Sequence, residues 1–190
     1  MATHFTGPML NSGKGSSRKW FENLPIGLNP DYTVLFDDFT GIALDSTNDW
    51  TVVKDSGAAV AIGADVAGGV ITMTSAATTD DDGSSIQGNE IFALASGRDI
   101  WFRANIQSSN ADDMDLCAGL TVNFATNPEA MLTAADRIVF QINDGDGSIL
   151  CKTEKNGTET STDSGVDAAD ATNVELAFHV VGTSYVEFFV

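Results

Sequence analysis

The chain has 190 residues, of which 43% are apolar and 19% are charged, a composition that predicts a soluble globular domain and argues against disorder throughout. Its formal net charge of −18, from 27 acidic and 9 basic residues, argues against nucleic-acid binding because phosphates would be repelled. No segment is apolar enough for a membrane helix and no signal peptide is recognisable, which fits assembly in a reducing cytoplasm.

Residues 1–30 combine Gly, Ser, Asn and Pro with scattered aromatic residues and show no sustained periodicity, so we expect an extended N-terminal arm. The arm carries three basic residues and one acidic residue, a charge of +2, which leaves −20 for residues 31–190. Such an arm suits an acidic neighbouring surface, which could belong to another copy; the alternative is a solvated leader. The expected partner-binding residues of the arm are Phe5, Met9, Leu10, Lys14, Arg18, Lys19, Trp20 and Phe21.

From Asp31 the sequence changes to short apolar runs separated by turn-forming residues, a pattern typical of an all-β antiparallel sandwich over residues 31–190. We expect strands, in chain order, at 33–39, 50–53, 59–62, 70–74, 84–87, 100–107, 116–124, 137–142, 149–155, 174–181 and 185–190. The only helix expected is one or two turns within residues 127–135.

Residues 100–107 carry the clearest strand pattern, because Ile100, Phe102, Ala104 and Ile106 alternate with polar residues and only Trp101 interrupts the alternation. The turn-forming residues 143–147 predict a hairpin between their flanking strands, and residues 174–190 predict a second hairpin. The last strand is apolar, so we expect it to be covered by further chain or by another chain.

Several of these segments resemble, in their order, tailed-phage virion structural proteins with a concanavalin A-like, laminin-G-like jelly-roll domain. The segments that carry the resemblance are FDDF (36–39), WTVV (50–53), AGGVITMT (67–74), DIWFRA (99–104), CAGLTV (117–122), DRIVF (136–140) and YVEFFV (185–190). The resemblance implies a jelly roll over residues 31–190 that continues past Val190. It also implies a capsid decoration or cement protein on the virion surface.

We therefore expect a non-enzymatic protein that binds the major capsid protein and forms a homo-oligomer, such as a trimer, with no cofactor and no metal. A carbohydrate-binding receptor module of a tail fibre or surface protein is the alternative, with Trp101 and Tyr185 as candidate glycan-stacking residues. A glycosidase is the weakest alternative, because the acidic run at 112–117 contains no Glu and has Cys117 where a carboxylate would be needed.

Three further groups of residues are interpreted as structural. The Asp-rich and Gly-rich segments 143–147 and 79–83 could collect Ca²⁺ but lack EF-hand spacing, so turns are expected. Cys117 and Cys151 lie in apolar runs and are expected to be small buried hydrophobic residues. His179 is expected on the surface of a strand, opposite its neighbours Phe178 and Val180, and not in a catalytic triad.

Overall fold

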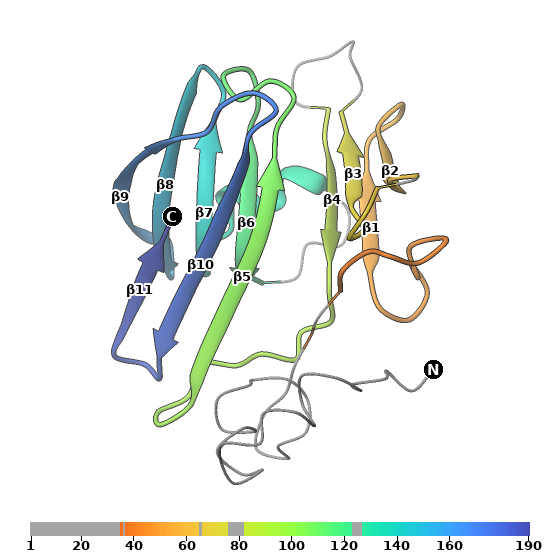
Figure 1. Ribbon diagram of the computed structural model, residues 1–190. Coiled ribbons are helices and arrows are strands. Elements are labelled where there is room, and N and C mark those ends of the chain that lie inside the picture. Colours follow the sequence, from red (N-terminus) through yellow and green to blue (C-terminus); the bar gives the residue numbers. More distant parts are fainter. Residues whose placement is uncertain (1–34, 36, 65, 76–81, 123–126) are drawn as a thin grey trace, which may run out of the picture. The chain divides into compact units, whose positions relative to one another are not determined.

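The computed structural model describes residues 35, 37–64, 66–75, 82–122 and 127–190 (Figure 1). The chain divides into two units, Met1–Asp38 and Phe39–Val190. The expected arm, and its expected boundary after residue 30, lie outside the described residues. Within the described part of the second unit, every paired strand is antiparallel and the only helix is a short 3-10 helix, η1 (Pro128–Thr133). No described helix has the length and apolar character required to cross a membrane.

The described strands form four antiparallel sheets, so the predicted all-β class is confirmed. Two sheets have two strands each: β1 (Thr51–Lys54) with β4 (Ser84–Gln87), and β2 (Ala59–Ile62) with β3 (Ile71–Thr74). The three-stranded sheet has the order β11 (Tyr185–Phe189), β10 (Asn173–Val181), β5 (Asp99–Gln107). The four-stranded sheet runs β6 (Leu116–Thr121), β7 (Arg137–Asn143), β8 (Asp146–Lys155), β9 (Thr158–Asp167).

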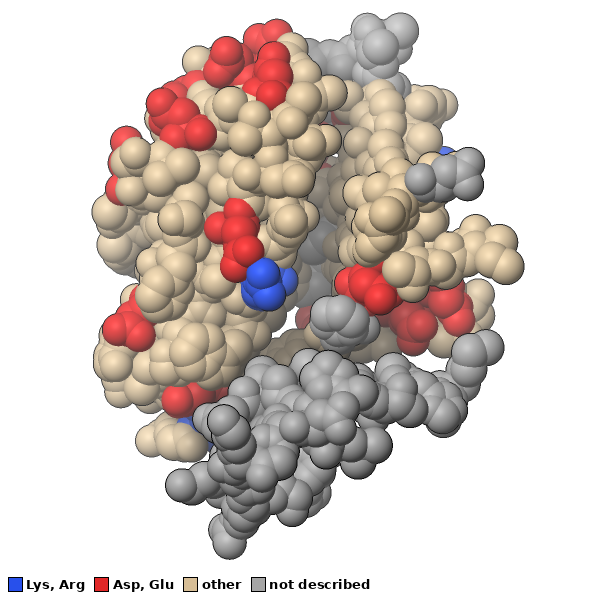
Figure 2. Space-filling model, viewed as in Figure 1, with Lys and Arg blue, Asp and Glu red and all other residues tan. Residues whose placement is uncertain are grey.

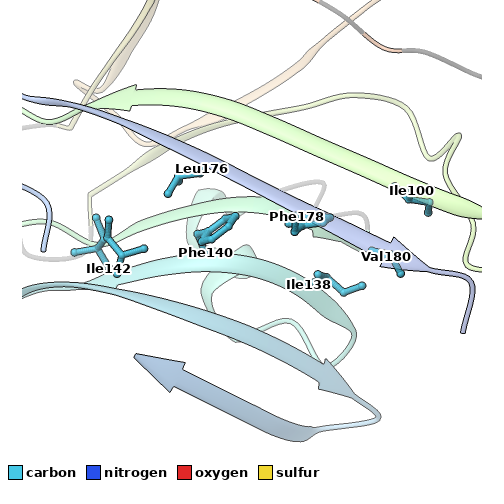
Figure 3. Packing of buried hydrophobic residues seen from close by; sticks show 8 residues of the cluster. Ile100, Ile138, Phe140, Ile142, Leu176, Phe178 and Val180 are labelled. Atoms are coloured by element: carbon cyan, nitrogen blue, oxygen red, sulfur yellow. The ribbon is translucent and has the colours of Figure 1, made fainter. Parts of the chain in front are cut away.

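The three-stranded and four-stranded sheets face each other across one hydrophobic core (Figure 3). Leu176 and Phe178 of β10 meet Phe140 and Ile142 of β7, and all four side chains are at most 1% exposed. The Phe140 and Phe178 ring centroids lie 6.1 Å apart, and Phe188 of β11 stands edge-on to Phe140 at 5.2 Å. Burial of these side chains is the main stabilising term for the two-layer packing.

The alternation expected for residues 100–107 is present in β5. Ile100 is buried in the core, and Phe102 and Ile106 pack against it, while the residues between them are exposed. Strand β10 pairs with β5 over the whole of β5, from Asn173 opposite Gln107 to Val181 opposite Asp99. The two strands therefore share one inward apolar face and one outward face.

Both expected hairpins and the expected helical turns are confirmed. Strands β7 and β8 join through Asp144 and Gly145, and Gly145 has φ +79°, the left-handed conformation that this tight turn requires. Strands β10 and β11 form the terminal hairpin. The Asn127 side chain accepts a hydrogen bond from the Glu129 N–H and so caps η1.

Three sequence predictions differ from the structure. Strand β9 was not expected, because its sequence TETSTDSGVD has almost no apolar residue; it is an edge strand that is mostly exposed. The described residues of the expected strand 33–39 are not in a strand, and Phe39, with φ +52°, lies outside the extended region. Strand β6 ends at Thr121, and Val122 lies outside it. The jelly-roll order itself stays a prediction.

Residues 39–94 bury far less apolar surface than the two facing sheets. Their buried apolar residues are Val53 and Ala58 among those described, and Ile42 is fully exposed. The other large apolar residues exposed in this stretch are Val66, Val70, Met73, Ile91 and Leu94. This stretch therefore has no core comparable to the one shared by β5–β11.

Candidate functional site

None of the eight arm residues expected to bind a partner, Phe5, Met9, Leu10, Lys14, Arg18, Lys19, Trp20 and Phe21, lies among the described residues. The partner-binding role of the arm therefore stays a prediction. The two candidate glycan-stacking residues, Trp101 and Tyr185, are both described, and both lie on the outward face of the β5–β10–β11 sheet.

The register of the three strands determines which side chains share this outward face. Trp101 lies opposite His179, and His179 lies opposite Glu187. The adjacent row contains Asp99, Val181 and Tyr185, and the row on the other side contains Arg103, Ala177 and Phe189. We call these nine side chains the outer face. Its Trp101, Tyr185 and Phe189 are 61%, 54% and 51% exposed.

Trp101 lies flat on the imidazole of His179. The ring centroids are 3.7 Å apart and the ring planes differ by only 6°. The His179 side chain is only 14% exposed, which its position beneath the indole explains. Phe178 and Val180 point into the core, so the prediction that His179 faces away from them is confirmed, but the ring is covered and not fully on the surface.

Two carboxylates hold the imidazole in place. His179 Nε2 lies 3.1 Å from Asp99 Oδ2, and Nδ1 lies 3.4 Å from Glu187 Oε2. Because both ring nitrogens have an acidic partner, one on each neighbouring strand, rotation of the ring would break at least one contact. The indole of Trp101 thus rests on an imidazole that has a carboxylate at each nitrogen, and both nitrogens donate at once only when the ring is protonated.

A second charged pair lies beside Trp101 on the same sheet. Arg103 donates two hydrogen bonds to Glu175, from Nε at 2.9 Å and from Nη2 at 2.8 Å. These bonds and the opposite charges raise the pKa of Arg103 and lower the pKa of Glu175. Together with Asp99 and Glu187, this pair makes the charged groups of the sheet mostly acidic, and further acidic side chains gather toward the top of the view in Figure 2.

Sequence reasoning missed the contribution of Asp99, His179 and Glu187 to this face. The out-of-phase Trp101 was the one available signal, because it placed a large aromatic residue among outward-facing polar residues. The side chains that support Trp101 could not be identified from the sequence. His179 lies 80 residues from Asp99, and the two residues come together only because β10 pairs with β5 in this register.

The acidic run Asp112–Cys117, considered for glycosidase chemistry, leads into β6 and structures two adjoining loops. Asp113 accepts a hydrogen bond from Asn110 Nδ2 at 2.7 Å, and Asp115 accepts one from the Asp144 N–H at 3.0 Å. The Asp112 carbonyl accepts the Gly145 N–H at 2.7 Å. These contacts tie the β5–β6 loop to the β7–β8 turn, so the acidic run has a structural role.

The two segments considered for calcium are only partly described. In the β7–β8 turn, Asp146 accepts the Ser148 N–H at 3.0 Å, and hydrogen bonding by the Ser148 side chain, together with this N–H, lowers the pKa of Asp146. In the other segment, only Asp82 and Gly83 are described. Among the described residues, no group of three or more His, Cys, Asp or Glu side chains could hold a metal ion.

Both cysteines are free and partly buried. Burial raises the pKa of the Cys117 thiol to about 12, so this thiol stays protonated at neutral pH. Cys151 packs against the hydrophobic core, and burial raises its pKa as well. Their interpretation as small apolar residues agrees with these environments.

Residues 39–190 use most of their basic side chains internally. Four of their six Lys and Arg residues, namely Arg103, Arg137, Lys152 and Lys155, form ion pairs with carboxylates. The most buried is Arg137, which contacts Glu154 and Glu159 and donates to the Met131 carbonyl beside η1. The remaining surface charge of this unit is therefore dominated by carboxylates.

No protein-family model, no curated protein and no solved structure matches the chain.

Proposed function

We propose that this chain is a non-enzymatic structural component of a tailed-phage virion, which decorates or cements the capsid by binding the major capsid protein. Support comes from the segment resemblance and from the all-β architecture, whose acidic run is used to structure loops. In this proposal the β unit lies outermost and the N-terminal arm contacts the capsid lattice. A homo-oligomer, such as a trimer, would let symmetry-related arms bind together.

The observation that carries this proposal is the separation of charge along the chain. Residues 1–30 have a charge of +2 and residues 31–190 have −20. Because four of the six Lys and Arg residues of 39–190 are paired with carboxylates of the same unit, this unit offers few cations to an acidic partner, and the basic residues of the arm are the proposed contacts. An arm of this kind would bind an acidic lattice surface while the acidic body keeps copies apart.

The test uses capsids assembled without this chain, to which the full-length protein is added until the lattice sites are saturated. We expect deletion of residues 1–30 to abolish binding. We also expect the triple variant Lys14→Glu, Arg18→Glu, Lys19→Glu to bind much more weakly, with the loss greatest at low salt. Occupancy is measured by particle mass and by electron microscopy of the labelled head.

A matched triple variant, Lys54→Glu, Arg98→Glu, Lys155→Glu, changes the charge by the same amount in the second unit and should keep near-normal occupancy. Thermal unfolding of each variant checks that the β unit remains folded. Full occupancy after deletion of residues 1–30 would refute the role of the arm. Labelling confined to the tail would refute the capsid assignment.

A further inference from the structure

We propose that the outer face of the β5–β10–β11 sheet binds a neutral glycan, with Trp101 as the stacking platform. This activity goes beyond capsid decoration, because it belongs to the β unit and needs neither the arm nor the capsid. The residues that carry it are Trp101, its support His179, the two carboxylates that hold His179, and Tyr185 on the outer strand.

The geometry of Trp101 is the first argument. A pyranose ring has one face made of C–H groups, and such a face binds well against the flat surface of an exposed indole. Trp101 is 61% exposed, yet its orientation is fixed by the parallel stack on His179 at 3.7 Å. An aromatic ring that is both exposed and held in one orientation loses little conformational entropy when a ligand binds it.

Hydrogen-bonding groups next to the indole are the second argument. Asp99 and Glu187 are each about half exposed, so their oxygens remain accessible to sugar hydroxyls while they hold His179. A carboxylate accepts through about four lone pairs, and its contact with one imidazole nitrogen leaves further acceptor capacity. An apolar platform flanked by a few oriented polar groups is the arrangement that gives a small-ligand site its specificity.

The spacing of the aromatic residues indicates an extended ligand. Trp101 and Tyr185 lie on strands separated by β10, which places them roughly 10 Å apart across the sheet at about 4.8 Å per strand. Tyr185 is exposed on the same face, one row from Trp101. A ligand that contacts both rings must therefore be an oligosaccharide and not a single sugar.

Charge identifies the class of glycan. The chain has a net charge of −18, and the two carboxylates beside the platform would repel sulfate, uronate or sialate groups. The one exposed cation of this sheet next to Trp101, Arg103, is bound to Glu175 through two hydrogen bonds. A neutral glycan thus fits the outer face better than an anionic one.

The experiment titrates the full-length protein with neutral hexasaccharides of glucose, mannose, galactose and N-acetylglucosamine, with a galacturonic acid hexamer as the anionic comparison. The chain has three Trp residues, so the indole N–H signals in an NMR spectrum are few, and the signal absent from Trp101→Ala identifies Trp101. We expect at least one neutral probe to shift the Trp101 signal at concentrations up to about 10 mM, and the anionic probe to leave it unmoved.

Variants separate the platform from its surroundings. We expect Trp101→Ala to weaken binding by about tenfold or more, since a central aromatic residue dominates such sites, and Trp101→Phe to keep part of the affinity. Glu187→Gln and Asp99→Asn should weaken binding less, and His179→Ala should weaken it while broadening the Trp101 signal. Met73→Ala is the matched control, because Met73 is also an exposed apolar residue but lies on β3.

Three outcomes would overturn the inference. The first is no Trp101 shift with any neutral probe, and the second is unchanged affinity in Trp101→Ala. The third is self-association through this face, seen as a Trp101-dependent change in sedimentation, which would assign the face to a second copy. Because the titration contains no capsid, failure here leaves the proposed virion role unaffected, and loss of capsid binding by the arm variants leaves glycan binding unaffected.

Discussion

Residues 99–190 and residues 39–94 both contain short strands with apolar side chains, yet they bury them very differently. Ten of the twelve buried apolar residues among those described belong to 99–190, where two sheets face each other. In 39–94 the strands pair only two by two, and residues such as Ile42 and Met73 remain exposed. A two-stranded sheet cannot form a core of its own, so β pairing alone does not produce burial; a second apolar layer is required.

The largest expected effect tests this contrast directly. Phe178→Ala removes a fully buried ring that contacts Phe102, Phe140 and Phe188, so the free energy of unfolding should fall by about 3–5 kcal/mol. Met73→Ala should change it by no more than about 0.5 kcal/mol, because Met73 is already 42% exposed. Chemical denaturation of both variants measures the difference. Equal losses in the free energy of unfolding would show that the Met73 side chain is buried in solution, contrary to the contrast between the two regions.

A smaller effect is expected from the charged groups on the other side of the four-stranded sheet. Arg137 is only 7% exposed and bridges Glu154 and Glu159, so Arg137→Ala leaves two carboxylates without their main partner. We expect a loss of about 3 kcal/mol in the free energy of unfolding. Arg103→Ala, which removes an exposed pair, should cost far less. Similar losses in the two variants would contradict the assigned difference in burial.

The smallest effect concerns the acid titration of two carboxyl groups, Glu175 in residues 99–190 and Asp45 in residues 39–94. The pKa of Glu175 is lowered by Arg103, and the pKa of Asp45 is lowered by hydrogen bonds from the Asn48 side chain and the backbone N–H groups of Asn48 and Thr47. Because the folded-state pKa of each carboxyl is lowered, the stability that each carboxylate contributes is complete above its unfolded-state pKa. It is lost as the pH falls through the folded-state pKa.

Carboxyl NMR titration measures both groups in the same sample. Both carboxyls should titrate below their ordinary range, and Arg103→Gln should return Glu175 toward its ordinary pKa while leaving Asp45 unchanged. If residues 39–94 opened independently of the core, Asp45 would instead titrate at its ordinary value while Glu175 stayed low.

The difference between the regions also separates what the sequence determined from what depended on tertiary structure. Local patterns sufficed wherever the signal is short-range. The alternation in β5, the turn-forming residues between β7 and β8, and the helical turns of η1 within 127–135 were all predicted from neighbouring residues. The edge strand β9 was missed because its partner β8 supplies the pairing while its own residues carry almost no apolar pattern.

Tertiary structure alone decided which residues meet. The sequence marked Trp101 as out of phase, but its support depends on β10 pairing with β5 in a register that brings His179 beneath the indole and Asp99 and Glu187 to the imidazole. It likewise predicted apolar strands throughout residues 50–190 without showing which of them share a core. Periodicity is set by each strand's own backbone, whereas register and layering are set by contacts between strands far apart in the chain.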